Sequence, residues 1–229
     1  MLQPKKKITK RQLKEDALVT SYAKARSFYD EHKRTISMGI TATAVVVIAL
    51  VVYIKNRQEN SDAALSRLSA VVSYYDNGQY QLAVGGVPER NLPGLASIVE
   101  EFGGSPGGEI ARFYLADAYY KLGEYDQALT QFEDFSAPNP TLEASRLSGI
   151  AACHEAQGRY AEAAGYYERA STADKKGALA AENLYNAART YARAGDREKA
   201  IQLYQRLKKE FPTSSFGRDA DRFIAELSV

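Results

Sequence analysis

The chain has 229 residues and a formal net charge of +2, with one cysteine, Cys153, and two histidines. This length allows one sizeable core or a short array of repeats. A lone cysteine excludes an internal disulfide framework and any multi-cysteine metal site, and two histidines argue against histidine-rich metal chemistry. We therefore predict no metal site, and no cofactor is expected either.

The small net charge hides two oppositely charged parts. Residues 1–34 carry ten Lys and Arg against four Asp and Glu, whereas residues 55–229 carry twenty against twenty-four. The segment between them, residues 35–54 (TISMGITATAVVVIALVVYI), has no ionisable side chain except Tyr53. A basic head and a mildly acidic body are thus joined by an apolar stretch.

Residues 35–54 are predicted to be a transmembrane helix. At ~1.5 Å per residue, twenty helical residues reach ~30 Å, the thickness of a hydrocarbon core. A cleaved signal peptide is the first alternative, but the basic region before the stretch is long and no convincing cleavage site follows it. A buried core helix is the second, but the uncharged run exceeds what a small domain needs.

The charge asymmetry predicts orientation. Short basic segments stay on the cytoplasmic side, so residues 1–34 are expected in the cytoplasm and the body on the far side. In a bacterium this makes a single-pass inner-membrane protein with a periplasmic C-terminal domain. The basic segment has helical apolar spacing, and three roles stay open for it: resting on anionic headgroups, docking on a partner, or remaining a solvated helix. Nucleic-acid binding is not expected, because no aromatic-basic readout motif accompanies the charge.

A short pattern, Gly-x-Tyr-x-x-Ala, recurs along the body. It occurs as GQYQLA, GEYDQA and GRYAEA at residues 78–83, 123–128 and 158–163, and as GDREKA, without the Tyr, at 195–200. The glycines of the last three copies, Gly123, Gly158 and Gly195, are separated by 35 and 37 residues. Periods near ~34 residues are typical of helical repeats. Glycine suits the tight turn between two helices, since it takes positive φ without strain, and alanine lets the helices approach.

At these residues the chain resembles the tetratricopeptide repeat (TPR) family. The resemblance implies an all-α solenoid of helical hairpins over residues 64–229, after a linker at 55–63. We place hairpins at about 64–88, 109–140, 144–177 and 181–214, and a capping helix at 215–228 that closes the apolar end of the array.

The interval between the first two motifs holds an insertion, residues 84–109. Its segment GLASIVEEF, residues 94–102, is predicted to be a short helix, and the glycines after it are predicted to form the turn into Glu109. A phosphate-binding loop is not expected, because no Lys-Ser/Thr follows and no strand precedes the glycines.

No catalytic constellation is found, so we predict that the protein is not an enzyme. Cys153 and His154 suggest a nucleophile pair, but neighbours on a helix point about 100° apart. His154 also occupies a position that is aromatic in the flanking repeats, which favours a packing role.

The whole arrangement is similar to single-span bacterial envelope TPR proteins, a group that includes the ancillary, chaperone-like subunit of the Sec translocon. This resemblance implies a groove lined by the first helix of each hairpin. Carried over by position, the protein-binding residues are Phe113, Asp117, Tyr120, Lys121, Ser148, Glu155, Glu182, Tyr185, Asn186, Arg189 and Arg193. Some TPR proteins clamp a C-terminal carboxylate, but Phe113 and Asp117 stand where their first Lys and Asn should be, which argues against that use.

Two non-enzymatic functions follow as expectations. The first is a membrane-anchored module that binds proteins in the periplasm and assists translocation or chaperoning of secretory polypeptides. The alternative is a structural subunit or assembly scaffold of a fixed envelope complex. Partners are expected to be proteins (the translocon, chaperones, secretory clients or a membrane complex), together with the membrane itself.

Overall fold

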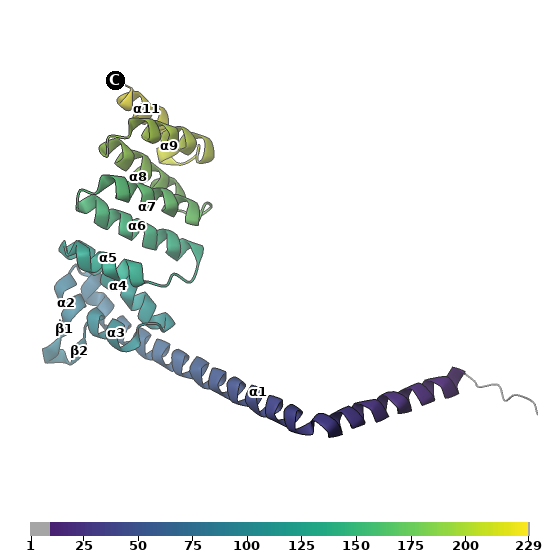
Figure 1. Cartoon of the computed structure of the whole chain (residues 1–229). Coiled ribbons are helices and arrows are strands. Elements are labelled where there is room, and N and C mark those ends of the chain that lie inside the picture. Colours follow the sequence, from purple (N-terminus) through teal and green to yellow (C-terminus); the bar gives the residue numbers. More distant parts are fainter. Residues whose placement is uncertain (1–9, 229) are drawn as a thin grey trace, which may run out of the picture. The chain divides into compact units, whose positions relative to one another are not determined.

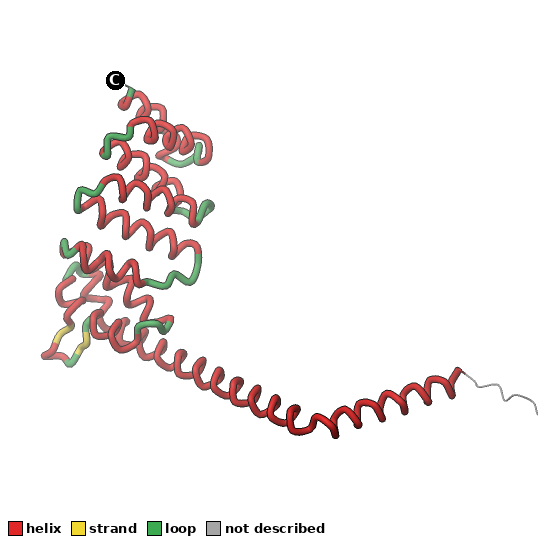
Figure 2. The backbone as a smooth tube through the Cα atoms, viewed as in Figure 1, coloured by secondary structure: helices red, strands yellow, loops and turns green. Residues whose placement is uncertain are grey.

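The computed structural model describes the backbone of residues 10–228 and the side chains of residues 19–228. The chain divides into two units, residues 1–56 and 57–229. Helices dominate both units, and loops are short (Figures 1 and 2). The predicted basic segment 1–34 lies partly outside the described residues, since they begin at Lys10.

The first unit contains most of the helix α1 (Lys10–Asp76). Among residues 10–228, this is the one helix long and apolar enough to cross a membrane, judged by length and composition alone. Its apolar side chains are open to the surroundings: Val46, Ile48 and Val52 are 66%, 63% and 60% exposed. This exposure argues against a core helix, which would bury such residues.

The expected linker at residues 55–63 is instead part of α1. Its sequence, KNRQENSDA, contains neither Gly nor Pro to end a helix. Ser61, Ala64, Leu68 and Val71 follow one another at helical spacing and are all buried. The end of α1 therefore begins the packed body and serves as the first helix of its first hairpin.

The first hairpin has a divided second helix. Helix α2 (Tyr80–Gly85) leads into a small ribbon of β1 (Gly86–Val87), the 3-10 turn η1 (Pro88–Arg90) and β2 (Leu92–Pro93). The strands pair antiparallel, Gly86 with Pro93 and Val87 with Leu92. Helix α3 (Leu95–Phe102) follows and confirms the short helix predicted at 94–102. Both α2 and α3 pack on the next hairpin, so the first hairpin extends beyond the predicted residue 88.

Three regular hairpins follow and stack in sequence order (Figure 1). They are α4 (Pro106–Leu122) with α5 (Tyr125–Asp134), α6 (Pro140–Ala156) with α7 (Tyr160–Ala173), and α8 (Ala180–Arg193) with α9 (Arg197–Glu210). Helix α4 starts earlier than expected, because Ser105 caps it by accepting from the Gly108 amide and Pro106 fits its first turn. The glycine-rich turn is therefore confined to Gly103 and Gly104.

The C-terminal cap consists of two short helices, α10 (Ser215–Arg218) and α11 (Ala220–Leu227), rather than one helix over 215–228. Ser214 starts the first by accepting a hydrogen bond from the Gly217 amide. Phe223, Ile224 and Leu227 pack against the core of the last hairpin. The apolar end of the stack is thereby covered.

The recurring motif explains the hairpin geometry. Gly123 ends α4 with a φ of 80°, in the left-handed region, and its amide donates to the carbonyls of the last turn. Gly158 and Gly195 adopt the same conformation. The alanines of the pattern and those facing them are fully buried: Ala116, Ala128, Ala151, Ala163, Ala188 and Ala200. Small side chains at these positions allow close helix–helix approach.

Two helical glycines that lack this turn role offer a matched test of the packing. A Cβ added at Gly149 of α6 would lie 2.6 and 2.7 Å from carbons of the Phe132 ring, whereas one at Gly165 of α7 would meet nothing within 4 Å. We expect Gly165→Ala to stabilise the fold by ~0.5–1 kcal/mol through helix propensity. We expect Gly149→Ala to destabilise it by ~1–3 kcal/mol through overpacking. Thermal unfolding of both full-length variants followed by circular dichroism checks this, and equal stability of the two would contradict the packing described.

Candidate functional site

The candidate residues lie on the first helices of the three regular hairpins. Helix α4 carries Phe113, Asp117, Tyr120 and Lys121; α6 carries Ser148 and Glu155; and α8 carries Glu182, Tyr185, Asn186, Arg189 and Arg193. Helices α4 and α6 contact one another, as do α6 and α8, so these faces adjoin. The structure divides the set into a charged cluster, an aromatic-walled cavity and several residues engaged elsewhere.

The charged cluster is centred on Glu155. Its carboxylate accepts hydrogen bonds from Arg189 Nη1 at 2.8 Å, Arg189 Nη2 at 3.0 Å and Arg193 Nη1 at 2.7 Å. The Tyr167 hydroxyl of α7 donates to the same group at 3.3 Å. The Glu155 side chain is 14% exposed, whereas those of Arg189 and Arg193 are 34% and 48% exposed. One sheltered carboxylate thus holds two more accessible guanidinium groups, which leaves a local excess of positive charge.

The ionisation of this cluster follows from its contacts. Burial acts to raise the pKa of the Glu155 carboxyl, but the hydrogen bonds from Arg189 and the charges of Arg189 and Arg193 outweigh it and place the pKa below its usual range. Burial, and then the Glu155 charge, raises the pKa of Tyr167, so its hydroxyl remains a donor. Arg193 extends the cluster by lying over the Tyr160 ring, 4.4 Å from its centroid.

The cavity lies at the other end of the candidate face. It has a volume of about 430 Å³, and its lining residues are Tyr75, Asp76, Ile110, Phe113, Tyr114, Asp117, Phe135 and Leu142. Phe113 packs tilted against Phe135, with ring centroids 5.4 Å apart. Asp117 accepts a hydrogen bond of 2.5 Å from the Tyr75 hydroxyl. Three successive first helices, the end of α1, α4 and α6, therefore contribute to one hollow.

Other candidates have different surroundings. Ser148 donates to Asn183 Oδ1 at 2.6 Å and so links α6 to α8. Tyr185 stacks on Phe216 at 4.7 Å and belongs to the packing of the C-terminal cap. Lys121 lies over the Tyr120 ring at 5.8 Å, and Glu182 is exposed. The repeat pattern did not point to Tyr75, Phe135 or Tyr167. Tyr75 lies in the first helix of the irregular first hairpin, whereas Phe135 follows the second helix α5 and Tyr167 belongs to the second helix α7.

Cys153 and His154 are both buried. Burial raises the pKa of the Cys153 thiol to about 12, so the thiolate needed for nucleophilic attack is not formed near neutral pH. The His154 ring stacks on Tyr166 with centroids 5.3 Å apart, which agrees with the packing role favoured by the repeat pattern. Burial, followed by the charge of Arg159, lowers the pKa of His154.

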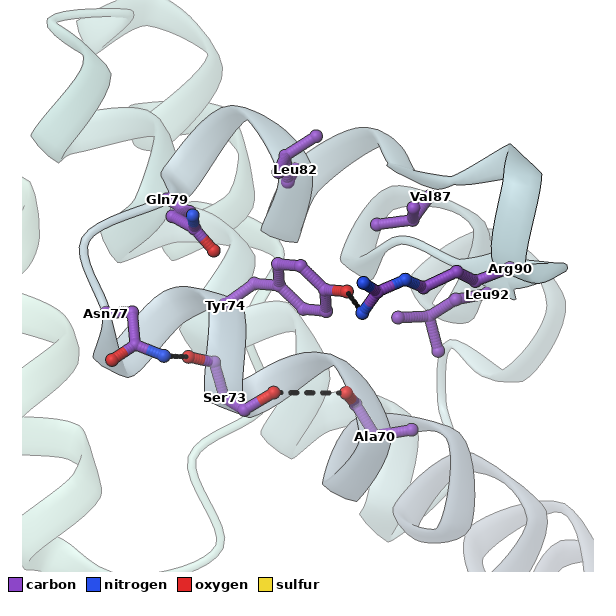
Figure 3. Close-up of a pocket in the computed structure, with 9 residues that line it drawn as sticks. All are labelled: Ala70, Ser73, Tyr74, Asn77, Gln79, Leu82, Val87, Arg90 and Leu92. Carbon is purple, nitrogen blue, oxygen red and sulfur yellow. Dashed lines mark hydrogen bonds between the residues drawn. The ribbon is translucent and has the colours of Figure 1, made fainter.

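A further hollow of about 730 Å³ lies beside the inserted ribbon (Figure 3). Tyr74 points across it and accepts a hydrogen bond of 2.8 Å from Arg90 Nη1. Leu82, Val87 and Leu92 supply its apolar lining. None of the candidate groove residues lines it, so the insertion provides a surface separate from the first-helix face.

The charged cluster predicts an acid-dependent contribution to stability. Because the folded-state pKa of Glu155 is depressed, its contribution is present above the ordinary value of 4.5 and is lost as the pH falls through the folded-state value. We expect Glu155→Gln to cost ~1–3 kcal/mol at pH 7, since two arginines lose their carboxylate. The difference from the parent chain should shrink in acid. Urea unfolding at several pH values measures it, with Glu162→Gln on the exposed surface of α7 as control; a pH-independent difference would contradict the assignment.

Comparison with known proteins identifies the repeats. Tetratricopeptide repeat models match residues 111–137 and residues 142–208. No curated protein matches the chain. A solved Podosopora anserina chain, described as a kinesin light chain with nearly identical TPR-like repeats, is 18% identical with a TM-score of 0.57, covering 73% of this chain and 86% of that one. A single-residue variant of it has the same identity, TM-score and coverage of this chain, with 85% of its own length covered. At this identity the likeness shows the fold alone, so the body of the chain is a TPR-like helical solenoid containing tetratricopeptide repeats, an architecture that typically serves protein–protein interaction.

Proposed function

We propose that the protein is a membrane-anchored TPR module that binds polypeptides on the periplasmic side and assists the translocation or chaperoning of secretory proteins. The observation that carries the binding role is the continuous first-helix face, where an aromatic-walled cavity and the Glu155 cluster lie on adjoining helices. Stacked repeats present such faces as extended binding surfaces. No group on this face has the arrangement of a nucleophile and its base, which favours binding over catalysis.

The anchor is supported by exposed apolar surface in α1. Fully burying one large aliphatic side chain is worth ~1.5–3 kcal/mol, so a run such as Val45–Ile54 is very unfavourable in water. Lipid is the simplest environment for it, because a continuous helix satisfies its own backbone polar groups. The excess of Lys and Arg in residues 1–34 supports a cytoplasmic N-terminus and a periplasmic body.

A fixed scaffold in an envelope complex is the second candidate. The hollow beside the inserted ribbon favours it, since it gives the body a second surface apart from the groove. Co-purification from mild detergent separates the two functions. A mixed, substoichiometric set of clients supports the first, and one stoichiometric partner supports the second.

Site-specific photo-crosslinking tests the binding role. A photoreactive residue at Tyr120 or at the exposed Glu182 should capture polypeptides in cells, because both positions lie on the first-helix face. The same residue at Glu162, exposed on the second helix α7, serves as the control. Mass spectrometry identifies the products. Capture at Glu162 as strong as at the two groove positions, or no protein product from either groove position, would refute the proposal.

Protease accessibility tests the orientation. Protease added outside spheroplasts should degrade residues 57–229 while leaving the basic N-terminal segment, detected by an N-terminal tag, with the cells. Permeabilised spheroplasts provide the control for intrinsic susceptibility. Protection of the hairpin stack in intact spheroplasts, followed by digestion after permeabilisation, would reverse the assigned sidedness.

A further inference from the structure

The cavity of about 430 Å³ combines two kinds of wall. Tyr75, Phe113, Tyr114 and Phe135 supply aromatic rings, and Asp76 and Asp117 supply carboxylates. The rings are held by one another: Tyr114 meets Tyr75 edge-on at 5.0 Å with planes at 90°, and Phe113 contacts Phe135 at 5.4 Å. The faces and edges of these rings are thereby set before any ligand arrives.

The carboxylates of this cavity have no cation of their own. Among the side chains of residues 19–228, neither Asp76 nor Asp117 takes part in an ion pair, whereas carboxylates such as Glu155 and Glu168 do. Asp117 is half-buried and accepts a hydrogen bond from Tyr75. Burial, and then this contact with Asp117, raises the pKa of Tyr75, so the phenol stays protonated and adds no negative charge. A negative charge that is not neutralised by an ion pair is thus held beside aromatic surface.

We propose that this cavity receives the basic side chain, Lys or Arg, of a polypeptide lying along the first-helix face. This inference rests on the proposed binding function and specifies the chemistry of its ligand. A carboxylate attracts the cationic head, aromatic faces attract it through their quadrupoles, and the apolar walls accept its aliphatic stem. An acidic ligand side chain is disfavoured here by repulsion from Asp76 and Asp117.

An adjoining cavity extends the specificity to a neighbouring residue. It has a volume of about 240 Å³ and shares Ile110, Phe135 and Leu142 with the first cavity. Its wall includes Pro138 and two charged groups. Arg57 donates to the Gly104 carbonyl at 3.2 Å, and the Glu109 carboxylate is already held by the amides of Gly104 and Ser136 and by Arg112. Because Arg57 and Glu109 are both engaged and the rest of the wall is largely apolar, this space suits an apolar side chain. In an extended strand, residues i and i+2 share one face, so the favoured ligand carries a basic and an apolar side chain two positions apart.

Matched peptides test this preference directly. The peptides have the sequence Ser-Ser-Xaa-Ser-Leu-Ser-Ser, with Arg, Lys, citrulline or Glu at Xaa, and are acetylated and labelled with fluorescein. Each is titrated with the full chain in non-ionic detergent, and binding is followed by fluorescence anisotropy. We expect the Arg and Lys peptides to bind about tenfold more tightly than the citrulline peptide at low salt, and the Glu peptide to bind most weakly. The advantage should shrink as NaCl is raised, since the charge attraction is screened.

Asp117→Asn removes the charge while keeping an oxygen that can accept from Tyr75. It should reduce the preference for Arg over citrulline several-fold, and Asp76 and the aromatic rings account for the preference that remains. Asp134→Asn is the matched control: it removes the same charge from α5, outside the cavity, where the side chain is 61% exposed, and it should preserve the preference.

Three outcomes would overturn the inference: equal affinity for the Arg and citrulline peptides, an Arg preference as large in Asp117→Asn as in the parent chain, or no binding of any peptide. Argininamide binding as tightly as the Arg peptide would also overturn it, because the cavity would then be a site for small cations. The proposed function is judged separately by the crosslinks from Tyr120 and Glu182. A failure of this inference with positive crosslinks leaves the binding role standing.

Discussion

Close contact between neighbouring helices at alanine positions is the constraint on which the rest of the structure depends. One hairpin cannot bury its own apolar face, so each needs the next, and the fully buried alanines set how near they come. Larger side chains there would push the first helices apart. The candidate face requires α4, α6 and α8 each to adjoin the next, since Glu155 on α6 contacts Arg189 on the neighbouring hairpin and the cavity draws its wall from α1, α4 and α6. The contacts that form the cavity and the Glu155 cluster therefore depend on the spacing between neighbouring helices.

The two ends of the candidate face differ in electrostatic character. At one end a single carboxylate is shared by Arg189 and Arg193, so positive charge remains accessible there. At the other, Asp117 and Asp76 stand among aromatic rings without a cationic partner in the described part of the chain. A peptide bound along this face would have one end in the acidic, aromatic environment of the cavity and the other end near the positive charge of Arg189 and Arg193. Such polarity can set the direction of a bound segment more strongly than it sets affinity.

The first hairpin links the solenoid to the proposed membrane anchor. Helix α1 supplies both the exposed apolar run and the first helix of the packed body, with no separate linker between them. Its buried stripe from Ser61 to Val71 is held by α3 and α4, and Ser61 accepts a hydrogen bond of 3.0 Å from the Gly107 amide. The ribbon that divides the second helix of this hairpin adds a surface which the regular repeats lack. This hairpin is thus the most specialised part of the stack.

The sequence by itself determined the repeats, their turns and the apolar run, because glycine at a positive-φ turn, buried alanine and a charge-free stretch are local requirements visible in a single chain. It also predicted the short helix at 94–102 and the packing of His154. Only the tertiary structure decided that the residues around Ser61 pack as part of the body and that the cap is broken at Asp219. Only it brought Tyr75 to Asp117 and Glu155 to two arginines, since these pairs are 42, 34 and 38 residues apart. Such contacts depend on how whole helices are placed, which no local pattern encodes.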